Sequence, residues 1–251
     1  MVLLVASSKG GVGKSTTALG VALALSRDRR VLLVDADMAS RSLDVFCGVS
    51  PAFHLGDVLT GRCALSRAVC VPFVERYPNL SLCTAPYSHE EADMPGGFPA
   101  TLAREIDAYT ADYDAVVIDT GSGSTVPAAL APHCDAAFVC SAQSPASIRA
   151  AAYSAEMLAT IPMVRLVICD FDLRGAHRGQ RAGMLEMIDA CRLRCIGVVP
   201  HDAGLIRYQE RGEVPKRITP SLQAYRNIAS RLTGSSVPLF TGIRLNCRHA
   251  L

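Results

Sequence analysis

Short, almost purely apolar runs recur along this chain, and between them apolar residues return at the three- and four-residue spacing of a helix. The runs show little polar alternation, which is typical of parallel strands covered by helices on both faces. We therefore predict strands at residues 2–6, 31–35, 80–84, 115–119, 137–141, 165–169 and 196–199, and helices at 14–26, 100–111, 145–159, 184–191 and 220–232. The alternation predicts an α/β fold with a doubly wound, mostly parallel sheet and helices on both faces.

Turn-forming residues mark the interruptions of this pattern. Residues 88–99 and 172–183 are rich in Gly, Pro or charged residues and are predicted to be surface loops. The second of them follows a strand end, where nucleotides commonly bind. A Gly234-Ser235-Ser236 triplet then separates a predicted domain of residues 1–234 from a tail of residues 235–251.

Composition narrows the class of protein. At 251 residues, half of them hydrophobic, the chain can bury one substantial core. A net charge of +2 is too small to indicate nucleic-acid binding by itself. The 10 cysteines include no Cys-x-x-Cys pair, so we assign them to packing in a reducing compartment. The first strand starts without a basic leader, and no apolar run reaches the roughly 18 residues of a membrane-spanning helix. We therefore expect a cytoplasmic protein.

The first two elements enclose a glycine-rich loop, residues 7–16, with the sequence SSKGGVGKST. Gly10, Gly11 and Gly13 allow a tight backbone that aims several N–H groups at one anion, and the helix behind adds the positive end of its dipole. Lys14 supplies a point charge for the outer phosphates of a nucleotide, and the Ser15 hydroxyl can ligate Mg²⁺. The order of strand, loop and helix therefore predicts a nucleotide phosphate site.

Three carboxylates lie at the carboxyl ends of two of the predicted strands. Asp35 and Asp37 stand two residues apart where the second strand ends, so both can face Mg²⁺ and a γ-phosphate. Asp119 ends the apolar run 115–119, the pattern of a Walker B strand that delivers one carboxylate to the metal. Each of them could instead cap a helix or a turn, an alternative that the sequence leaves open.

The loop resembles the deviant Walker A motif of the MinD/ParA ATPases. Ser8 stands where the common P-loop has Gly, and a second lysine, Lys9, lies inside the loop. Residues 35–44 resemble the first switch of the MinD branch of this family. ParA proteins usually carry Pro-Gln where this chain has Met38-Ala39, so the switch favours the MinD branch.

The similarity extends well beyond the loop. The sequences DVLTG at residues 57–61 and RGEVP at residues 211–215 also resemble MinD elements, so the match runs from residue 2 to about residue 215. The resemblance implies a P-loop NTPase of the SIMIBI type with ATP and Mg²⁺ as cofactors. It implies ATP hydrolysis to ADP and phosphate as the reaction.

The resemblance also implies roles for individual residues. Asp37 would orient the attacking water, Asp35 would support the magnesium shell, and Lys9 would reach across an ATP-dependent homodimer to the partner's phosphates, as an arginine finger does. The implied catalytic residues are Lys9, Lys14 and Asp37. The implied metal-site residues are Ser15, Asp35 and Asp119. The implied nucleotide-binding residues are Lys9, Gly10, Gly11, Val12, Gly13, Lys14, Ser15, Thr16, Gly123, Asp170 and Pro200.

Two positions depart from the family pattern. Gly121 stands where MinD relatives carry a proline, which loosens the second switch, while Gly123 keeps the glycine whose N–H can sense a γ-phosphate. Cys169 stands where the family places an Asn that hydrogen-bonds the adenine, and a thiol is a poor replacement. Asp170 could accept from the adenine amino group, or backbone near Pro200 could hold the base; the sequence leaves both open.

The resemblance implies an ATP-driven dimerisation switch, slow without a partner, that positions cell-division proteins in bacterial division-site placement. The tail carries Phe240, Ile243 and Cys247 near helical spacing. It either contacts the inner face of the cell membrane as a peripheral amphipathic segment or packs on the domain itself. A ParA-type ATPase whose ATP dimer binds DNA is one alternative, against which the first switch argues. A nucleotide-binding scaffold with little turnover is another. An iron–sulfur carrier would need the Cys-x-x-Cys pair that the sequence lacks.

Overall fold

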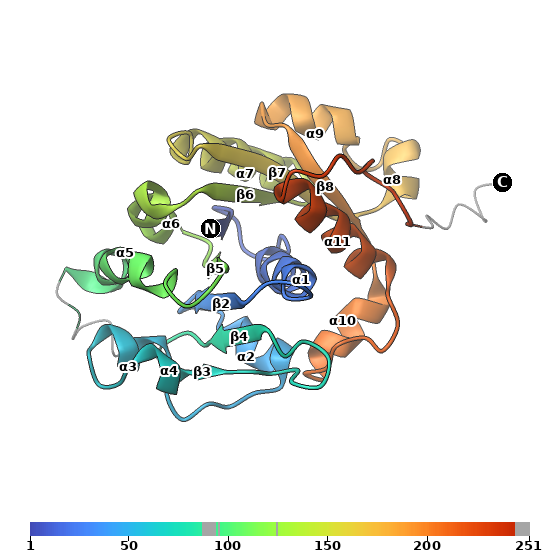
Figure 1. The fold of residues 1–251 in the computed structure, drawn as a ribbon. Coiled ribbons are helices and arrows are strands. Elements are labelled where there is room, and N and C mark those ends of the chain that lie inside the picture. The colour runs from blue at the N-terminus through green and yellow to red at the C-terminus, as the bar shows by residue number, and fades with distance from the viewer. Residues whose placement is uncertain (87–93, 95, 124, 244–251) are drawn as a thin grey trace.

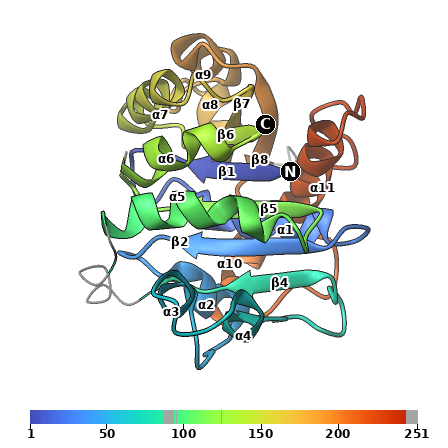
Figure 2. The same cartoon turned by 60° about the vertical axis from the view of Figure 1, so that its left-hand side comes forward.

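The computed structural model describes residues 1–86, 94, 96–123 and 125–243, and these form one sheet of eight strands between helices (Figure 1). The strands are β1 (Val2–Ala6), β2 (Val31–Ala36), β3 (Val69–Cys70), β4 (Leu80–Cys83), β5 (Ala115–Thr120), β6 (Ala136–Ser141), β7 (Met163–Phe171) and β8 (Cys195–Pro200). Their order is β3-β4-β2-β5-β1-β6-β7-β8, and β3 pairs antiparallel with β4 while the other pairs are parallel. Figure 2 shows β1, β5 and β2 side by side. The predicted doubly wound fold is confirmed.

Helices cover both faces of the sheet. The face with α1 (Lys14–Leu25) also carries α2 (Ser42–Cys47), α10 (Ala203–Glu210) and α11 (Pro220–Leu232). The other face carries α3 (Leu55–Leu59), α4 (Leu65–Ala68), α5 (Gly97–Tyr109), α6 (Thr125–Leu130), α7 (Pro145–Met157) and α9 (Met184–Cys191). A short α8 (Leu173–His177) follows β7, and a 3₁₀ turn, η2 (Ala131–His133), follows α6.

Successive side chains of β1 point to opposite faces of the sheet, and both faces are covered, which explains the unbroken apolar sequence of this strand. Leu3 and Val5 join the core on the α1 face, while Leu4 and Ala6 join the core on the α7 face. All of these side chains are buried because helices exclude water from both faces. An apolar run rather than an alternating one is therefore what a central parallel strand requires.

Some predicted boundaries and elements were wrong. The antiparallel edge strand β3 was missed because it has two residues, which carry no periodicity. The predicted loop 172–183 contains α8, which Asp172 caps by accepting from the N–H groups of Arg174 and Gly175, both at 3.0 Å. Most of the other predicted loop lies outside the described residues, which omit 87–93 and 95, and α5 starts at Gly97 rather than at residue 100.

The first part of the predicted tail packs on the domain. Arg231 of α11 donates to the carbonyls of Val237 and Pro238, both at 2.6 Å, and the Asn227 amide donates to the Thr241 carbonyl at 2.7 Å. Residues 244–251, which contain the rest of the predicted amphipathic segment, lie outside the described residues. Within the described part of the chain, no helix combines the length and apolarity that a membrane crossing needs.

Candidate nucleotide site

The glycine-rich loop joins the carboxyl end of β1 to the first turn of α1. Gly11 and Gly13 have positive φ angles of 71° and 92°, which side-chain-bearing residues rarely adopt. A Cβ atom on Gly13 would also lie 3.1 Å from the Cβ of Cys169. Buried Lys14 donates from Nζ to the carbonyl of Lys9 at 3.4 Å, so its ammonium group lies over the loop. This is the backbone that a phosphate-binding cradle requires.

Ser8 ties this loop to α7. Its backbone N–H donates to Oγ of Ser154 at 3.0 Å, and its hydroxyl donates to the carbonyl of Ala150 at 2.9 Å. Ser154 is fully buried and donates to the same carbonyl at 2.9 Å. Because Lys9 is the next residue, α7 helps to fix where the backbone of this lysine lies.

Strands β2 and β5 bring two buried carboxylates side by side. Asp35 and Asp119 are direct partners in the strand register and are 1% and 0% exposed. Asp35 accepts the N–H of Asp37 at 3.0 Å and that of Leu43 at 3.3 Å. Burial, and then the charge of Asp119, raise the pKa of Asp35 well above its ordinary value.

Asp119 lacks such donors: neither carboxylate oxygen has a hydrogen-bond partner among the described residues. Burial raises the pKa of Asp119 to about 7, although the nearby Ser15 hydroxyl and Lys14 ammonium lower it. An unpartnered buried carboxylate fits a cation. Within the described residues, no cluster of three His, Cys, Asp or Glu side chains could hold a metal alone. Mg²⁺ would therefore be coordinated by Asp119, Ser15, nucleotide phosphate and water. This matches the usual coordination of Mg²⁺, which combines one or two carboxylates with phosphates and several waters.

Asp37 connects the two predicted switches. Its Oδ1 accepts the N–H groups of Ala39 at 3.1 Å and Ser40 at 3.0 Å, so the turn-capping alternative is observed. A Cβ atom on Gly121 would lie 2.9 Å from this oxygen, so the proline of MinD relatives would not fit this arrangement. Asp37, Gly121 and Gly123 line one hollow of about 360 Å³, which brings the two switches together.

A second hollow of about 240 Å³ is lined in part by the loop itself. Its lining includes Gly11, Val12, Gly13, Thr16, Cys169, Asp170 and Pro200. The structure therefore brings part of the glycine-rich loop and the two residues predicted near the base, Asp170 and Pro200, to one hollow. Lys14 lies on the carbonyl of Lys9, and both Ser15 and Lys14 lie close enough to Asp119 to lower its pKa.

The base end of this second hollow departs from the predicted chemistry. The Cys169 thiol lies 3.4 Å from Oγ1 of Thr17, so it is engaged with α1. Asp170 has a left-handed φ of 53°, and its carboxylate lies 2.6 Å from Nδ1 of His201. An ionised Asp170 accepts but cannot donate, so it can satisfy only one half of an adenine edge.

Sequence reasoning missed Gln209. This residue of α10 lines the same hollow, is only 6% exposed, and its side-chain amide makes no hydrogen bond with a described residue. An amide supplies both a donor and an acceptor, as an adenine edge requires. The only signal in the sequence was its place two residues before the RGEVP element.

A glycine-rich loop after a central parallel strand, with a lysine and an unpartnered buried aspartate beside it, defines a P-loop nucleotide-binding protein. A family model described as the CobQ/CobB/MinD/ParA nucleotide binding domain matches residues 3–215. The chain belongs to this family, and its relatives place it with the MinD proteins.

Two relatives and two solved structures carry that conclusion. The septum site-determining protein MinD of Bacillus subtilis is 31% identical over 94% of this chain and 90% of its own length. MinD of Synechocystis is 27% identical over 94% and 91%. A chain of the MinC:MinD cell division protein complex of Aquifex aeolicus superposes with a TM-score of 0.83 at 25% identity, covering 95% of this chain and 97% of that one. MinD of Pyrococcus horikoshii complexed with Mg-ADP, at 19% identity and a TM-score of 0.79 over 93% and 96%, shares the fold.

Proposed function

We propose that this chain is a MinD-type switch that binds Mg²⁺ and ATP, dimerises with ATP bound, and hydrolyses it. The observation that carries the proposal is the placement of Lys9. This second lysine of the loop forms no ion pair with a described residue, while Lys14 already lies over the loop. Lys14 thus serves the nucleotide of its own chain, which leaves Lys9 for the phosphates of a facing copy.

Different residues around the loop have different roles in phosphoryl transfer to water. Backbone N–H groups and Lys14 neutralise the phosphates. Ser15 and Asp119 would hold Mg²⁺, which would supply positive charge to offset the outer phosphates. Asp37, which lines the hollow beside the switches, holds the attacking water. Such a reaction needs positioning and charge neutralisation rather than covalent chemistry by the protein.

Dimerisation follows from charge. Two facing loops with two lysines each repel one another until two ATP molecules lie between them. Loss of the γ-phosphate removes contacts made by Lys9 and the switches, which releases the dimer. We propose slow turnover by the chain alone, because Oδ1 of Asp37 caps its own turn and a partner is needed to complete the alignment.

The relatives suggest what the switch acts on. Those compared are septum site-determining proteins, and one of the solved structures pairs MinD with MinC. We therefore propose that the ATP dimer of this chain positions cell-division proteins at the division site. The tail of residues 235–251, which follows α11, would bring the protein from the cytoplasm to the inner face of the membrane.

Co-sedimentation tests this proposal. Wild type, Lys9→Ala and a chain ending at residue 243 are mixed with lipid vesicles or with DNA, each with ATP and with ADP. The last variant keeps the segment that packs on α11 and loses only residues 244–251. We expect ATP-dependent vesicle binding by the wild type alone. Binding to DNA and not to vesicles would instead indicate a ParA-type protein. Binding to both in the same amount with ATP and with ADP would contradict the proposal of an ATP-dependent switch.

A further inference from the structure

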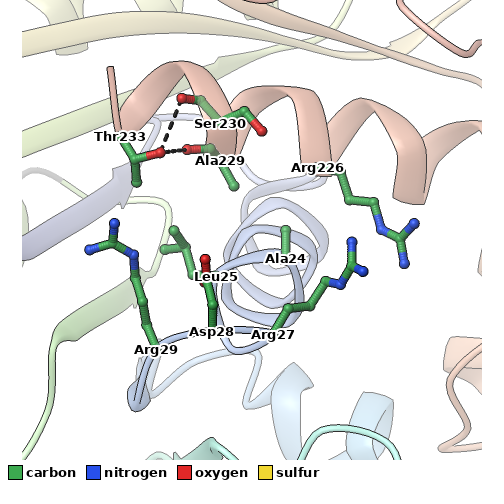
Figure 3. A pocket seen from close by; sticks show the side chains of 9 residues that line it. All are labelled: Ala24, Leu25, Arg27, Asp28, Arg29, Arg226, Ala229, Ser230 and Thr233. Carbon is green, nitrogen blue, oxygen red and sulfur yellow. Dashed lines mark hydrogen bonds between the residues drawn. The ribbon is translucent and has the colours of Figure 1, made fainter. Parts of the chain in front are cut away.

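A separate pocket of about 390 Å³ lies between the last turns of α1 and α11 (Figure 3). Helix α1 leads away from the nucleotide loop, and α11 runs from Pro200 at the end of β8, which accepts from Ser221, to Ile196 near its start, which accepts from Arg231. The pocket therefore lies toward the amino ends of the strands, whereas the nucleotide site lies at their carboxyl ends. Its lining includes the apolar residues Ala24, Leu25 and Ala229.

Three arginines border this pocket. Arg27 and Arg29 extend from the turn after α1, and Arg226 extends from α11. Figure 3 shows the guanidinium groups of Arg27 and Arg226 near one another, with Arg29 across the pocket. Asp28 is the single acid among the nine lining residues. None of the three arginines forms an ion pair with any residue that the structure describes, whereas the neighbouring Arg30 pairs with Asp114 at 3.1 Å.

The arginines are held against their mutual repulsion. Partial burial, and then the charge of Arg27, lower the pKa of Arg226; Arg76 acts in the same direction, and Tyr77 opposes them. Helix C-termini attract cations, which accounts for Arg27 and Arg29 near the end of α1. Arg226 lies in the middle of α11, where Tyr77 favours its charged form, and its guanidinium still lies near that of Arg27. Such an arrangement costs stability unless an anion offsets it.

We propose that this pocket binds a phosphate group, carried by a soluble phosphate ester or by an anionic phospholipid headgroup. Guanidinium groups match phosphate oxygens in geometry and charge, and a bidentate guanidinium–phosphate contact is among the stronger hydrogen-bonded pairs. The Ser230 side chain at the rim adds a hydroxyl donor. The site is independent of the proposed ATPase function, because no residue that lines it belongs to the nucleotide site.

The test uses the full chain saturated with Mg-ADP, so that added phosphate cannot occupy the nucleotide loop. Inorganic phosphate is the soluble probe, and vesicles of phosphatidylglycerol, compared with phosphatidylcholine, are the lipid probe. The variants are Arg226→Gln and Arg27→Gln. Arg30→Gln is the matched control, because it removes the same charge from an arginine that already has a partner and does not line the pocket.

We expect both pocket variants to weaken binding of the effective probe about tenfold or more, and Arg30→Gln to change it little. Without phosphate, Arg226→Gln should be at least as stable to urea as the wild type, because the substitution removes the repulsion between Arg226 and Arg27. The same urea measurement shows whether the variant folds. Binding of inorganic phosphate identifies a soluble ester, and binding of phosphatidylglycerol vesicles alone identifies a headgroup. Equal weakening by all three variants, or no binding of either probe, would overturn the proposal.

Discussion

The hydroxyl of Ser8 and the carbonyl of Ala150 lie 2.9 Å apart and join the nucleotide loop to the middle of α7 across 142 residues of sequence. Ser8 stands where the common P-loop has glycine, which has no hydroxyl to make this bond. The residue that follows is Lys9, the lysine we place at the phosphates of a facing copy. The hydrogen bond therefore links α7 to the dimer contact.

This link predicts a selective defect in Ser8→Gly. Loss of one hydrogen bond and added backbone freedom should weaken ATP-dependent dimerisation by about threefold to tenfold. Binding of nucleotide by the monomer should change less, because Lys14 and the loop N–H groups remain. Sedimentation velocity measures the first and ADP titration the second. Ser26→Ala, which removes a hydroxyl bonded within its own turn of α1, is the control. Equal loss in both measurements would show that Ser8 only stabilises the loop.

Asp119 predicts a pH dependence of stability. Its pKa rises from 3.8 to about 7 in the folded protein, so the folded state holds a proton that the unfolded state has lost in between. Stability of the nucleotide-free protein should therefore fall as the pH rises from about 4 to about 7, by on the order of 4 kcal/mol. Asp119→Asn should remove this fall in stability. The same variant should also lose the gain in nucleotide affinity that Mg²⁺ gives the wild type. Urea unfolding at about pH 5 and about pH 8 measures the difference.

The control for this prediction is Asp114→Asn. Hydrogen bonds from exposed Arg30 lower the pKa of Asp114, which is the opposite direction. Its contribution is present at neutral pH and is lost as the pH falls through the lowered pKa. A pH profile of Asp119→Asn that parallels the wild type would show that another buried group, such as Asp35, controls the profile.

The second hollow, which we assign to the adenine base, predicts that a substitution at Cys169 can restore ATP affinity lost by a substitution at Gln209. Gln209→Ala should weaken ATP binding by about tenfold, since it removes the amide that can meet both sides of the adenine edge. Cys169→Asn restores the family's amide in the same hollow and should recover part of the affinity in the double variant. Gln223→Ala, on α11 outside this hollow, is the control. Titration with ATP and with GTP measures affinity and selectivity. A Gln209→Ala variant with wild-type affinity would leave the base to Asp170 and the backbone.

The close approach of Gly121 to Asp37 predicts a catalytic effect. A Cβ atom at this position must displace the carboxylate, since the gap to Oδ1 is 2.9 Å. Gly121→Ala should therefore lower kcat for ATP hydrolysis at least tenfold, with a smaller change in KM, because the nucleotide loop is untouched. Gly183→Ala, where a Cβ atom meets nothing within 4 Å, should behave as wild type. An unchanged kcat in Gly121→Ala would mean that Asp37 does not hold the water where we place it.

The sequence predicted what depends on local pattern. Strands such as β1 are visible because burial on both faces leaves an unbroken apolar run, and the phosphate loop is visible because its glycines and lysine are contiguous. Contacts between distant segments were not visible. The bonds from Ser8 to α7 and the approach of Gly121 to Asp37 depend on how helices pack, which no local spacing encodes. Gln209 was missed for the same reason, and the Arg226 pocket exists only once α11 lies against α1.

In this mechanism, Lys9 is the residue that makes ATP a dimerising ligand. Sedimentation velocity of wild type and Lys9→Ala, with a non-hydrolysable ATP analogue and with ADP, measures this role of Lys9. We expect a dimer only for the wild type with the analogue and monomers in the other three samples. The Lys9→Ala monomer should still bind nucleotide. An analogue-dependent dimer of Lys9→Ala as tight as that of the wild type would contradict this role of Lys9.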